Sequence, residues 1–488
     1  MTTRRLFAAL FAVALFTMAV RETLDPDLWW HLRTGQLVLE RGIPHYDTFS
    51  FTVPDHEWIT HEWLSQVFMW GVYRIGGLPG LILVFALLIA LAFWLVYLCS
   101  AGRPFLAAFV VLLAAVASAI VWGVRPQIFN LLLTAAFVHV VERYKTKQVS
   151  QRALWLLPLL TILWANLHSG YLLGVVLLGT YTVGEALQRW LRPADQRTLA
   201  WPAVRSLAMV TVTTFLVAVL NPSGPALWLY PFFTLGSQAM QTYILEWQSP
   251  DFHQSYFWPF AVMLFLGVIS WLFSQERPVW SELLLFLGTA AAGLLSARHI
   301  PLFAVVSTPI VARHLLSAFT GSRVYPLLSG RMPEPTLTRT FAALNWVILL
   351  LALVAGGVWT ARKISGNEEA IRKTYPVAAV DFLEQEGLTR TRGYNTYNWG
   401  GYLIWRGVPV FVDGRADVYG DDFLFYYLQS YRVEDGWAQP LDDFDVDYVL
   451  MEQSSALSTL LATSQEWREI YRDDIAQVFV RDEIELQE

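Results

Sequence analysis

The chain has 488 residues, of which 55% are hydrophobic and only 15% are charged. Soluble globular chains carry about 25% charged residues, so this composition indicates a protein that folds in a membrane. The formal net charge of −6 gives no reason to expect a nucleic-acid partner. The single cysteine, Cys99, excludes disulfides and cysteine-based metal sites within one chain.

Apolar segments of membrane-spanning length recur along the chain. A bilayer core takes roughly 20 mostly apolar residues per helix, and eleven segments fit, with the span at 153–167 the shortest. The first segment reads as a retained helix, because Arg21, Glu22 and Asp25 follow it without the small-residue cleavage pattern of a signal peptide. The predicted spans are residues 5–21, 79–99, 104–123, 127–142, 153–167, 170–187, 204–220, 258–273, 280–296, 300–318 and 342–361.

The distribution of Lys and Arg sets the orientation. With the N-terminus in the cytoplasm, the Lys and Arg that lie between the spans gather in the predicted inner segments, whereas the short outer loops hold only Arg125 and Arg298. Residues 221–257, on the outer side, contain no Lys or Arg. The sequence therefore predicts a multi-pass membrane protein with a cytoplasmic N-terminus and two outer regions, residues 21–78 and the tail.

The tail and the long outer loop each have their own pattern. Residues 1–362 form the predicted transmembrane domain, and residues 363–488 form a predicted extracytoplasmic α/β domain. In the outer loop, two Trp-rich amphipathic helices, near 28–39 and 62–75, should lie in the membrane interface, the second ending at Gly76-Gly77. In the tail, helices are predicted near 377–387, 419–432 and 455–470, and strands near 391–396, 408–412, 446–451 and 476–481.

Two acids sit where the first span meets this loop. Asp25-Pro26 would make a good helix N-cap with proline at the first helical position, and Asp27 would favour the helix dipole. Alternatively, a carboxylate held at the membrane surface can take a proton from an acceptor hydroxyl or hold a metal ion. Both interpretations are compatible, since a capping residue can also be a base.

A second polar cluster follows in the same loop. His56, Glu57, His61 and Glu62 have one residue too many for a zinc-binding H-E-x-x-H helix, so these residues favour polar contacts over a metal site. Asp47 either caps a turn or lines a site. In the tail, the acids of the segment 413–417 either contact a sugar or fix a turn.

At this point the layout resembles the GT-C glycosyltransferases, which use sugars linked to lipid phosphates and include protein O-mannosyltransferases, aminoarabinose transferases and oligosaccharyltransferases. Shared features are an acid pair after the first helix, two interfacial helices, about eleven spans and an outer C-terminal domain. A narrower resemblance, to bacterial membrane proteins with this GT-C-like fold, covers nearly the whole chain and rests on the segments DPDLWWHLRTGQ, HEWLSQVFMW, RPQIFNLLL, NLHSGYLLG, EWQSPDF, RHIPLF and FVDGRADVYG.

The resemblance implies roles for particular residues. The acid of the first loop serves the family as catalytic base or metal ligand, and Asp25 and Asp27 match its D-x-D form, with Asp27 favoured. Many relatives have D-E there, and the first acid of that pattern falls on Pro26, which leaves the choice of aspartate open. His61, with Glu62 beside it, takes the place of a residue that touches the lipid phosphate, although the Pro-Pro of the family is missing.

The expected chemistry suggests further residues. A polyprenyl phosphate that leaves with negative charge needs cations or hydrogen-bond donors at its phosphate. Residues at suitable depth on the outer side are Arg125, Arg298, His168 and His299, and Glu246 and Asp251 are weaker candidates for lining the site.

The sequence thus predicts a membrane glycosyltransferase of the cell (inner) membrane. Its donor would be a polyprenyl-phosphate-linked sugar, and its acceptor a lipid, glycan or protein on the outer face. A divalent cation, Mg²⁺ or Mn²⁺, is a candidate cofactor held by the acid pair. A transporter is disfavoured because the predicted spans carry almost no charge at mid-depth. A non-catalytic scaffold or lipid-binding protein remains the alternative, and an open groove beside a buried carboxylate would argue against it.

Overall fold

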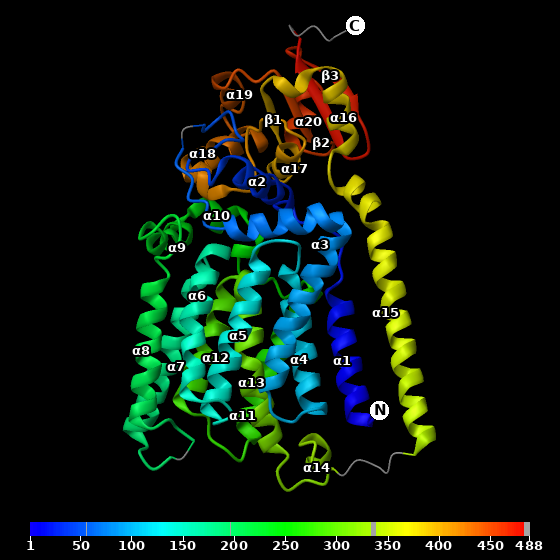
Figure 1. Cartoon of the computed structure of the whole chain (residues 1–488). Coiled ribbons are helices and arrows are strands. Elements are labelled where there is room, and N and C mark those ends of the chain that lie inside the picture. The colour runs from blue at the N-terminus through cyan, green and yellow to red at the C-terminus, as the bar shows by residue number, and fades with distance from the viewer. Residues whose placement is uncertain (55, 196, 333–337, 483–488) are drawn as a thin grey trace.

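The computed structural model describes residues 1–54, 56–195, 197–332 and 338–482. A bundle of helices carries a small mixed α/β domain on one end, and the N-terminus lies at the opposite end of the bundle (Figure 1). The bundle helices are α1 (Thr3–Ala19), α3 (Trp63–Cys99), α4 (Phe105–Ser118), α5 (Gln127–Lys145), α6 (Leu156–Leu167), α7 (Tyr171–Leu191), α8 (Trp201–Val217), α11 (Trp258–Phe273), α12 (Trp280–Leu295), α13 (Ile300–Ala318) and α15 (Arg339–Thr374).

Each of the eleven predicted spans coincides with one of these helices. Within the described residues, four helical stretches are long and apolar enough to cross a membrane by themselves: Trp63–Cys99, Ser255–Phe273, Ala297–Ala318 and Arg339–Thr374. Four shorter apolar helices accompany them. These helices place the protein in a membrane, and the exact number of crossings stays a prediction.

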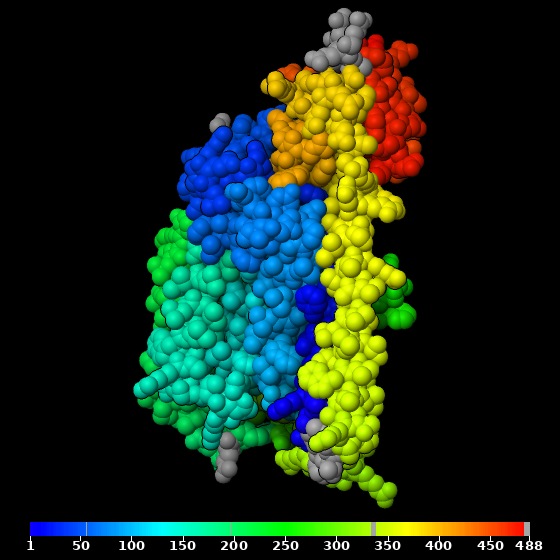
Figure 2. Space-filling model, turned by 45° about the vertical axis from the view of Figure 1, so that its right-hand side comes forward, coloured from blue at the N-terminus to red at the C-terminus, as the bar shows by residue number. Residues whose placement is uncertain are grey.

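The interior of the bundle centres on α13, which packs against α4, α5, α11 and α12. In its apolar window, 83% of the residues are buried, against 6% for α15. The helix α15 packs along α1 and leaves most of its apolar side chains exposed (Figure 2). Such a surface suits lipid, because lipid covers apolar side chains at no cost.

The long outer loop forms the two predicted interfacial helices. The first is α2 (Leu28–Arg41), and the second is the opening part of α3, which bends into the bundle at Gly77. Gly77 has a φ of +58°, a conformation that glycine adopts readily, and Pro79 follows in the next turn. The short helices α9 (Ala226–Gly236) and α10 (Gln238–Tyr243) lie at the same end of the bundle, and α14 (Tyr325–Leu328) lies at the other (Figure 1).

The C-terminal domain is built on one four-stranded sheet with the order β1-β2-β4-β3. The strand β1 (Gly393–Asn395) pairs parallel with β2 (Tyr448–Glu452), and β4 (Ala476–Arg481) pairs antiparallel with β2 and with β3 (Trp467–Arg472). Its helices are α16 (Val377–Gln385), α17 (Gly400–Trp405), α18 (Ala416–Tyr431), α19 (Gln439–Asp443) and α20 (Ala456–Leu461).

Three details of the tail differ from the sequence-based expectation. Residues 408–412 form no strand, and only an isolated bridge joins Val410 to Ser50 of the outer loop. The predicted helix 455–470 ends at Leu461, because Trp467–Arg472 pairs with β4 as an edge strand whose charged side chains face outwards. The helix α15 runs to Thr374 and therefore continues through the domain boundary predicted at 363.

Buried charges fasten this domain to the outer loop. Arg415 bonds Asp413 and also Asp47, each at 2.6 Å, and the three side chains are fully buried. Asp47 additionally accepts the backbone N–H of Ser50 at 2.9 Å. Asp47 therefore caps a turn and joins the two regions. The two acids of the segment 413–417 therefore differ: Asp413 is a structural group, whereas Asp417 faces a cavity.

Candidate active site

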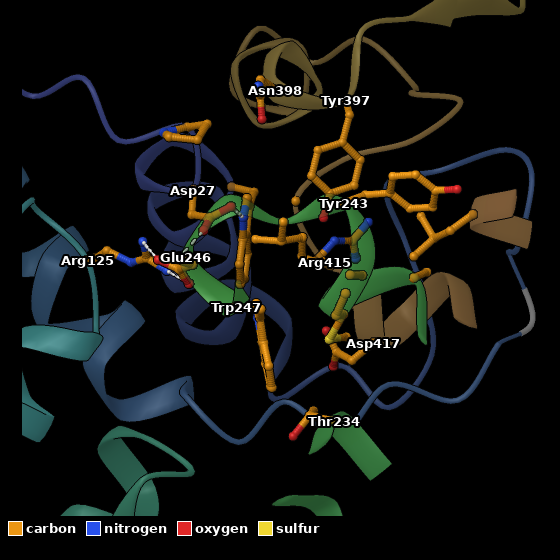
Figure 3. Close-up of a pocket in the computed structure, with 18 of the residues that line it drawn as sticks. Asp27, Arg125, Thr234, Tyr243, Glu246, Trp247, Tyr397, Asn398, Arg415 and Asp417 are labelled. Atoms are coloured by element: carbon orange, nitrogen blue, oxygen red, sulfur yellow. Dashed lines mark hydrogen bonds and ion pairs between the residues drawn. The ribbon is translucent and has the colours of Figure 1, made fainter. Parts of the chain in front are cut away.

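A cavity of about 640 Å³ lies between the C-terminal domain and the end of the bundle that carries it (Figure 3). Its walls come from α2, the start of α3, the loops before α5, α7 and α13, the segment 230–247, the turns that precede α17 and α18, and α18 itself. Most of the site residues proposed from the sequence line it, although they come from distant parts of the chain: Asp27, His61, Glu62, Arg125, His168, Glu246 and Arg298.

The acid pair sits at the edge of this cavity. Asp27 precedes α2 in the N-cap position, but its side chain accepts no capping hydrogen bond. Its Oδ1 instead accepts the indole N–H of Trp30 at 3.0 Å, and its backbone N–H donates to Asp25 Oδ1 at 3.0 Å. Asp25 therefore caps the turn that precedes α2, as one interpretation of the sequence expected, whereas the side chain of Asp27 is directed to Trp30 and the cavity.

Burial and mutual repulsion change the acidity of both carboxyls. Burial raises the pKa of Asp25, although Arg125 opposes the shift. Burial and the neighbouring Asp25 together raise the pKa of Asp27 to about 7. A carboxyl with a pKa near neutral pH is a suitable general base, since it can both accept and release a proton under these conditions.

Arg125 stands between the acids. Its guanidinium lies 3.5 Å from Asp25 Oδ2, 3.7 Å from Asp27 Oδ2 and 3.3 Å from Glu246 Oε2. It is placed there by the loop that ends at Pro126, immediately before α5. Figure 3 shows Arg125 and Glu246 joined beside Asp27. The Arg125 guanidinium thus lies near three carboxylates at once, and each distance is longer than that of a good charge-assisted hydrogen bond.

Arg298 differs from Arg125 in having no carboxylate partner. It lies on the 3-10 turn Ala297–His299 before α13, with its guanidinium 4.1 Å from the ring centroid of Trp247. Among the described residues it makes no ion pair and no side-chain hydrogen bond. Its donors face the cavity, next to the N-terminus of a long helix, so the position suits an anion.

A cluster around Glu62 forms another part of the wall. Glu62 lies 3.6 Å from His61 Nε2 and 3.4 Å from His168 Nε2. Because Gly170 N–H donates to His168 Nδ1, a neutral His168 carries its proton on Nε2, towards Glu62. His61 also packs on the ring of Tyr230 at 4.2 Å. Despite burial, the neighbouring Glu62 raises the pKa of His61.

Sequence reasoning named Glu246 and the acids of 413–417, but it missed the tyrosines that the C-terminal domain and the segment 230–247 contribute to the cavity. Tyr230 donates to Asp417 at 2.9 Å, and both face the cavity. Isolated tyrosines in a tail carry no pattern that could have identified them. The full aromatic lining is Trp30, Trp58, Tyr230, Tyr243, Trp247, Tyr397, Tyr427 and Tyr431.

Three of the proposed residues do not line the cavity. His299 follows Arg298, but its ring does not line the cavity and its Nδ1 is buried without a hydrogen-bond partner. Asp251 is exposed and pairs with His253 at 2.9 Å. Asp25 does not line this cavity either, but it reaches the site through Arg125.

The acid pair is a poor fit for a divalent cation in this arrangement. The Arg125 guanidinium contacts both carboxylates and so takes up the position between them. Across the described parts of the chain, no group of three or more His, Cys, Asp or Glu side chains is placed to hold a metal ion. Around Glu62, the proton on His168 Nε2 would also have to leave before that nitrogen could bind a metal.

Comparisons with known proteins identify the fold. No protein-family model and no curated protein matches the chain. Among solved structures, the archaeal oligosaccharyltransferase AglB from Archaeoglobus fulgidus, in complex with an inhibitory peptide and a dolichol-phosphate, is similar with a TM-score of 0.52 at 13% identity. The match covers 92% of this chain and 69% of AglB.

A second neighbour matches along nearly its whole length. The apo structure of ArnT from Cupriavidus metallidurans has a TM-score of 0.51 at 16% identity, and the match covers 97% of both chains. AglB and ArnT are polyprenyl-phosphate-dependent glycosyltransferases of the GT-C superfamily. The chain therefore has the GT-C fold that its sequence resembles, and identities this low speak to the fold alone.

Proposed function

We propose that the protein is a membrane glycosyltransferase that moves a sugar from a polyprenyl phosphate to an acceptor hydroxyl. The observation that carries this proposal is one cavity lined both by Asp27, which Arg125 joins to Asp25, and by Arg298, a cation without a carboxylate partner among the described residues. A base and an anion site on one cavity are the two groups that such a transfer needs. The GT-C fold, and neighbours solved with a dolichol-phosphate and with an acceptor peptide, support it.

In the proposed reaction the Asp25–Asp27 pair takes the proton of the acceptor hydroxyl. The acceptor oxygen forms a bond to the anomeric carbon of the sugar, and the bond from that carbon to the phosphate oxygen breaks. The electron pair leaves with the polyprenyl phosphate, whose added charge Arg298 stabilises through its free donors. Arg125 holds both aspartates and Glu246 in place. Which aspartate takes the proton depends on the side from which the acceptor approaches.

Arg125 also has a consequence for cofactors. Because its guanidinium lies between the carboxylates, we propose that transfer proceeds without a divalent cation at the acid pair. A guanidinium cannot lose its charge at any ordinary pH, so it keeps the acids in place without a metal.

The proposed topology follows the Lys and Arg distribution. Residues 1–362 form the membrane domain, with the N-terminus in the cytoplasm, and residues 363–488 lie on the outer face of the cell membrane. This orientation brings the cavity to the outer surface, where a lipid-linked donor and its acceptor meet. The open cavity beside buried carboxylates favours an enzyme over the alternative of a non-catalytic scaffold.

The test uses proteoliposomes supplied with a panel of sugars linked to undecaprenyl phosphate, with release of undecaprenyl phosphate as the readout. We expect the Asp25→Asn and Asp27→Asn double variant to lose transfer by about 10²–10⁴-fold, the range for a general base. The matched control is Asp251→Asn, which removes an exposed acid outside the cavity. EDTA should change the wild-type rate by less than about twofold. Unchanged transfer in the double variant would refute the assignment.

A further inference from the structure

A second, smaller cavity lies on the other side of the Asp25-Pro26-Asp27 turn. Its volume is about 600 Å³, and it is bordered by the C-terminal end of α1, the segment Trp122-Gly123 and α15. Pro26 lines both cavities, whereas Asp25 lines only the smaller and Asp27 only the larger. The acid pair is therefore reached from two sides.

The smaller cavity combines cations with tryptophans. Arg21 donates to the carbonyl of Ala119 at 3.0 Å and lies 5.4 Å from the ring centroid of Trp122. Within the described residues it forms no ion pair with a carboxylate. Lys363 lies 5.1 Å from the ring centroid of Trp359 and pairs with Glu22. Paired cations and tryptophans are typical of the level at which lipid head groups lie.

Lipid can reach this cavity from the side. The helix α15, which forms one wall, has only 6% of its apolar window buried within the protein. Leu351, Val354 and Val358 are exposed along the turns that lead up to Trp359, and the face of α15 is open to the surroundings (Figure 2). An acyl chain could lie against these side chains while its head group enters the cavity.

Asp25 lines this cavity, although only 10% of its side chain is exposed. The backbone of Gly123 passes close to the carboxylate, and a Cβ there would lie only 3.0 Å from Asp25 Oδ2. Any residue other than glycine would therefore press on the carboxylate and partly cover it. The smaller cavity thus leads from the lipid side to one member of the acid pair.

We propose that this cavity binds the anionic head group of a membrane lipid that serves as acceptor. Arg21 and Lys363 bind the anionic group, and an acceptor hydroxyl of the head group meets Asp25. Resting on the proposed transferase function, this assigns the acceptor to the amphiphilic lipids.

The first test measures binding and needs no catalysis. Full-length protein in liposomes is labelled with a photoactivatable phosphatidylglycerol, and the attachment sites are mapped by mass spectrometry. We expect labels on residues 18–25 and 359–363. Each cation removed should lower labelling about fivefold, the effect of one Lys or Arg near an anionic lipid surface, so Arg21→Ala with Lys363→Ala should nearly abolish it. The control is Arg362→Ala, an exposed cation one residue away on α15, which should leave labelling unchanged.

The second test identifies the source of the head group. Unlabelled phosphatidylglycerol should displace the probe at least tenfold better than undecaprenyl phosphate. The reverse order would make the smaller cavity a site for the donor and overturn the proposal, as would labelling that is equal in the double variant and in Arg362→Ala. Both results leave the transferase assignment intact, because that assignment fails only if the aspartate double variant keeps full transfer.

Discussion

The protein contains two clusters of three acids and their cations, one at each end of the bundle, and their geometries differ. The inner cluster joins Glu142, Glu282 and Glu185 to Arg313 and Lys145, with Arg313 2.5 Å from Glu142 and Lys145 2.8 Å from Glu185. Its three acids are almost fully buried. In the outer cluster, Arg125 keeps Asp25, Asp27 and Glu246 at 3.3–3.7 Å, beside a cavity.

The difference separates a structural network from a site. Hydroxyls complete the inner cluster, since Tyr181 donates to Glu142 at 3.0 Å and Ser281 donates to Glu185 at 2.7 Å. A closed, satisfied network of this kind holds helices together. In the outer cluster, carboxylate lone pairs and guanidinium donors face open space. A group that exchanges protons and binds an incoming ligand needs this access. Similar residue types therefore serve stability at one end and chemistry at the other.

The largest effect should come from breaking the inner cluster. Arg313→Ala leaves Glu142 and Glu282 buried without their cation, and loss of one partner of a buried pair costs about 3–5 kcal/mol. Denaturant unfolding of the purified protein in detergent micelles should show this loss in the free energy of unfolding. Arg125→Ala should lose less than half as much, because its acids border a cavity. Equal losses would remove the distinction between the clusters.

The next effect concerns Arg298, which, unlike Arg125, has no carboxylate partner among the described residues. Arg298→Ala should weaken binding of undecaprenyl phosphate by about 10- to 100-fold, the loss expected for one or two hydrogen bonds to a charged group. Arg298→Lys should retain part of the affinity, because it keeps the charge but not the forked donors. Titration of the solubilised protein followed by tryptophan fluorescence measures both constants. Comparable affinity in wild type and Arg298→Ala would place the phosphate elsewhere.

A smaller effect should come from the C-terminal domain pressing on the acid pair. A Cβ at Gly414 would lie 2.0 Å from Asp27 Oδ1, so Gly414→Ala must displace that carboxylate. Displacement of a reacting group by about 1 Å can reduce a rate by about 10²-fold, and we expect a 10- to 100-fold slower transfer with little change in stability. Gly357→Ala, where a Cβ would meet nothing within 4 Å, is the control. If the two variants transferred at the same rate, Asp27 would not be a reacting group.

The mildest test is the pH dependence of transfer. The base must be deprotonated to act, and the pKa of Asp27 is raised to about 7. The rate of transfer should therefore be highest above pH 7. It should decline as the pH falls through that value, by about tenfold for each pH unit below it. Initial rates between pH 5 and pH 9 would show this limb. A decline that begins only near pH 4, where an exposed carboxyl titrates, would mean that the base is not buried.

The sequence predicted the helices well and the site only in part. Apolar length, which is a local property of the chain, placed every predicted span on a helix, whereas the number of crossings and the orientation read from Lys and Arg stay predictions. The acids of the outer loop could be recognised because they directly follow the first predicted span. What the sequence could not reveal was pairing: Arg125 and Arg298 look alike as rare outer cations, yet only the fold engages one with three acids and leaves the other without a carboxylate partner among the described residues. Asp417 and Tyr230 likewise meet only through the docking of the tail.

The most direct test of the central claim is the structure of the protein bound to undecaprenyl phosphate in a lipid nanodisc. The account predicts the phosphate within hydrogen-bond reach of the Arg298 guanidinium, inside the larger cavity and on the same side as Asp27. A phosphate at the inner cluster around Arg313, or one outside the larger cavity and away from both aspartates, would contradict it.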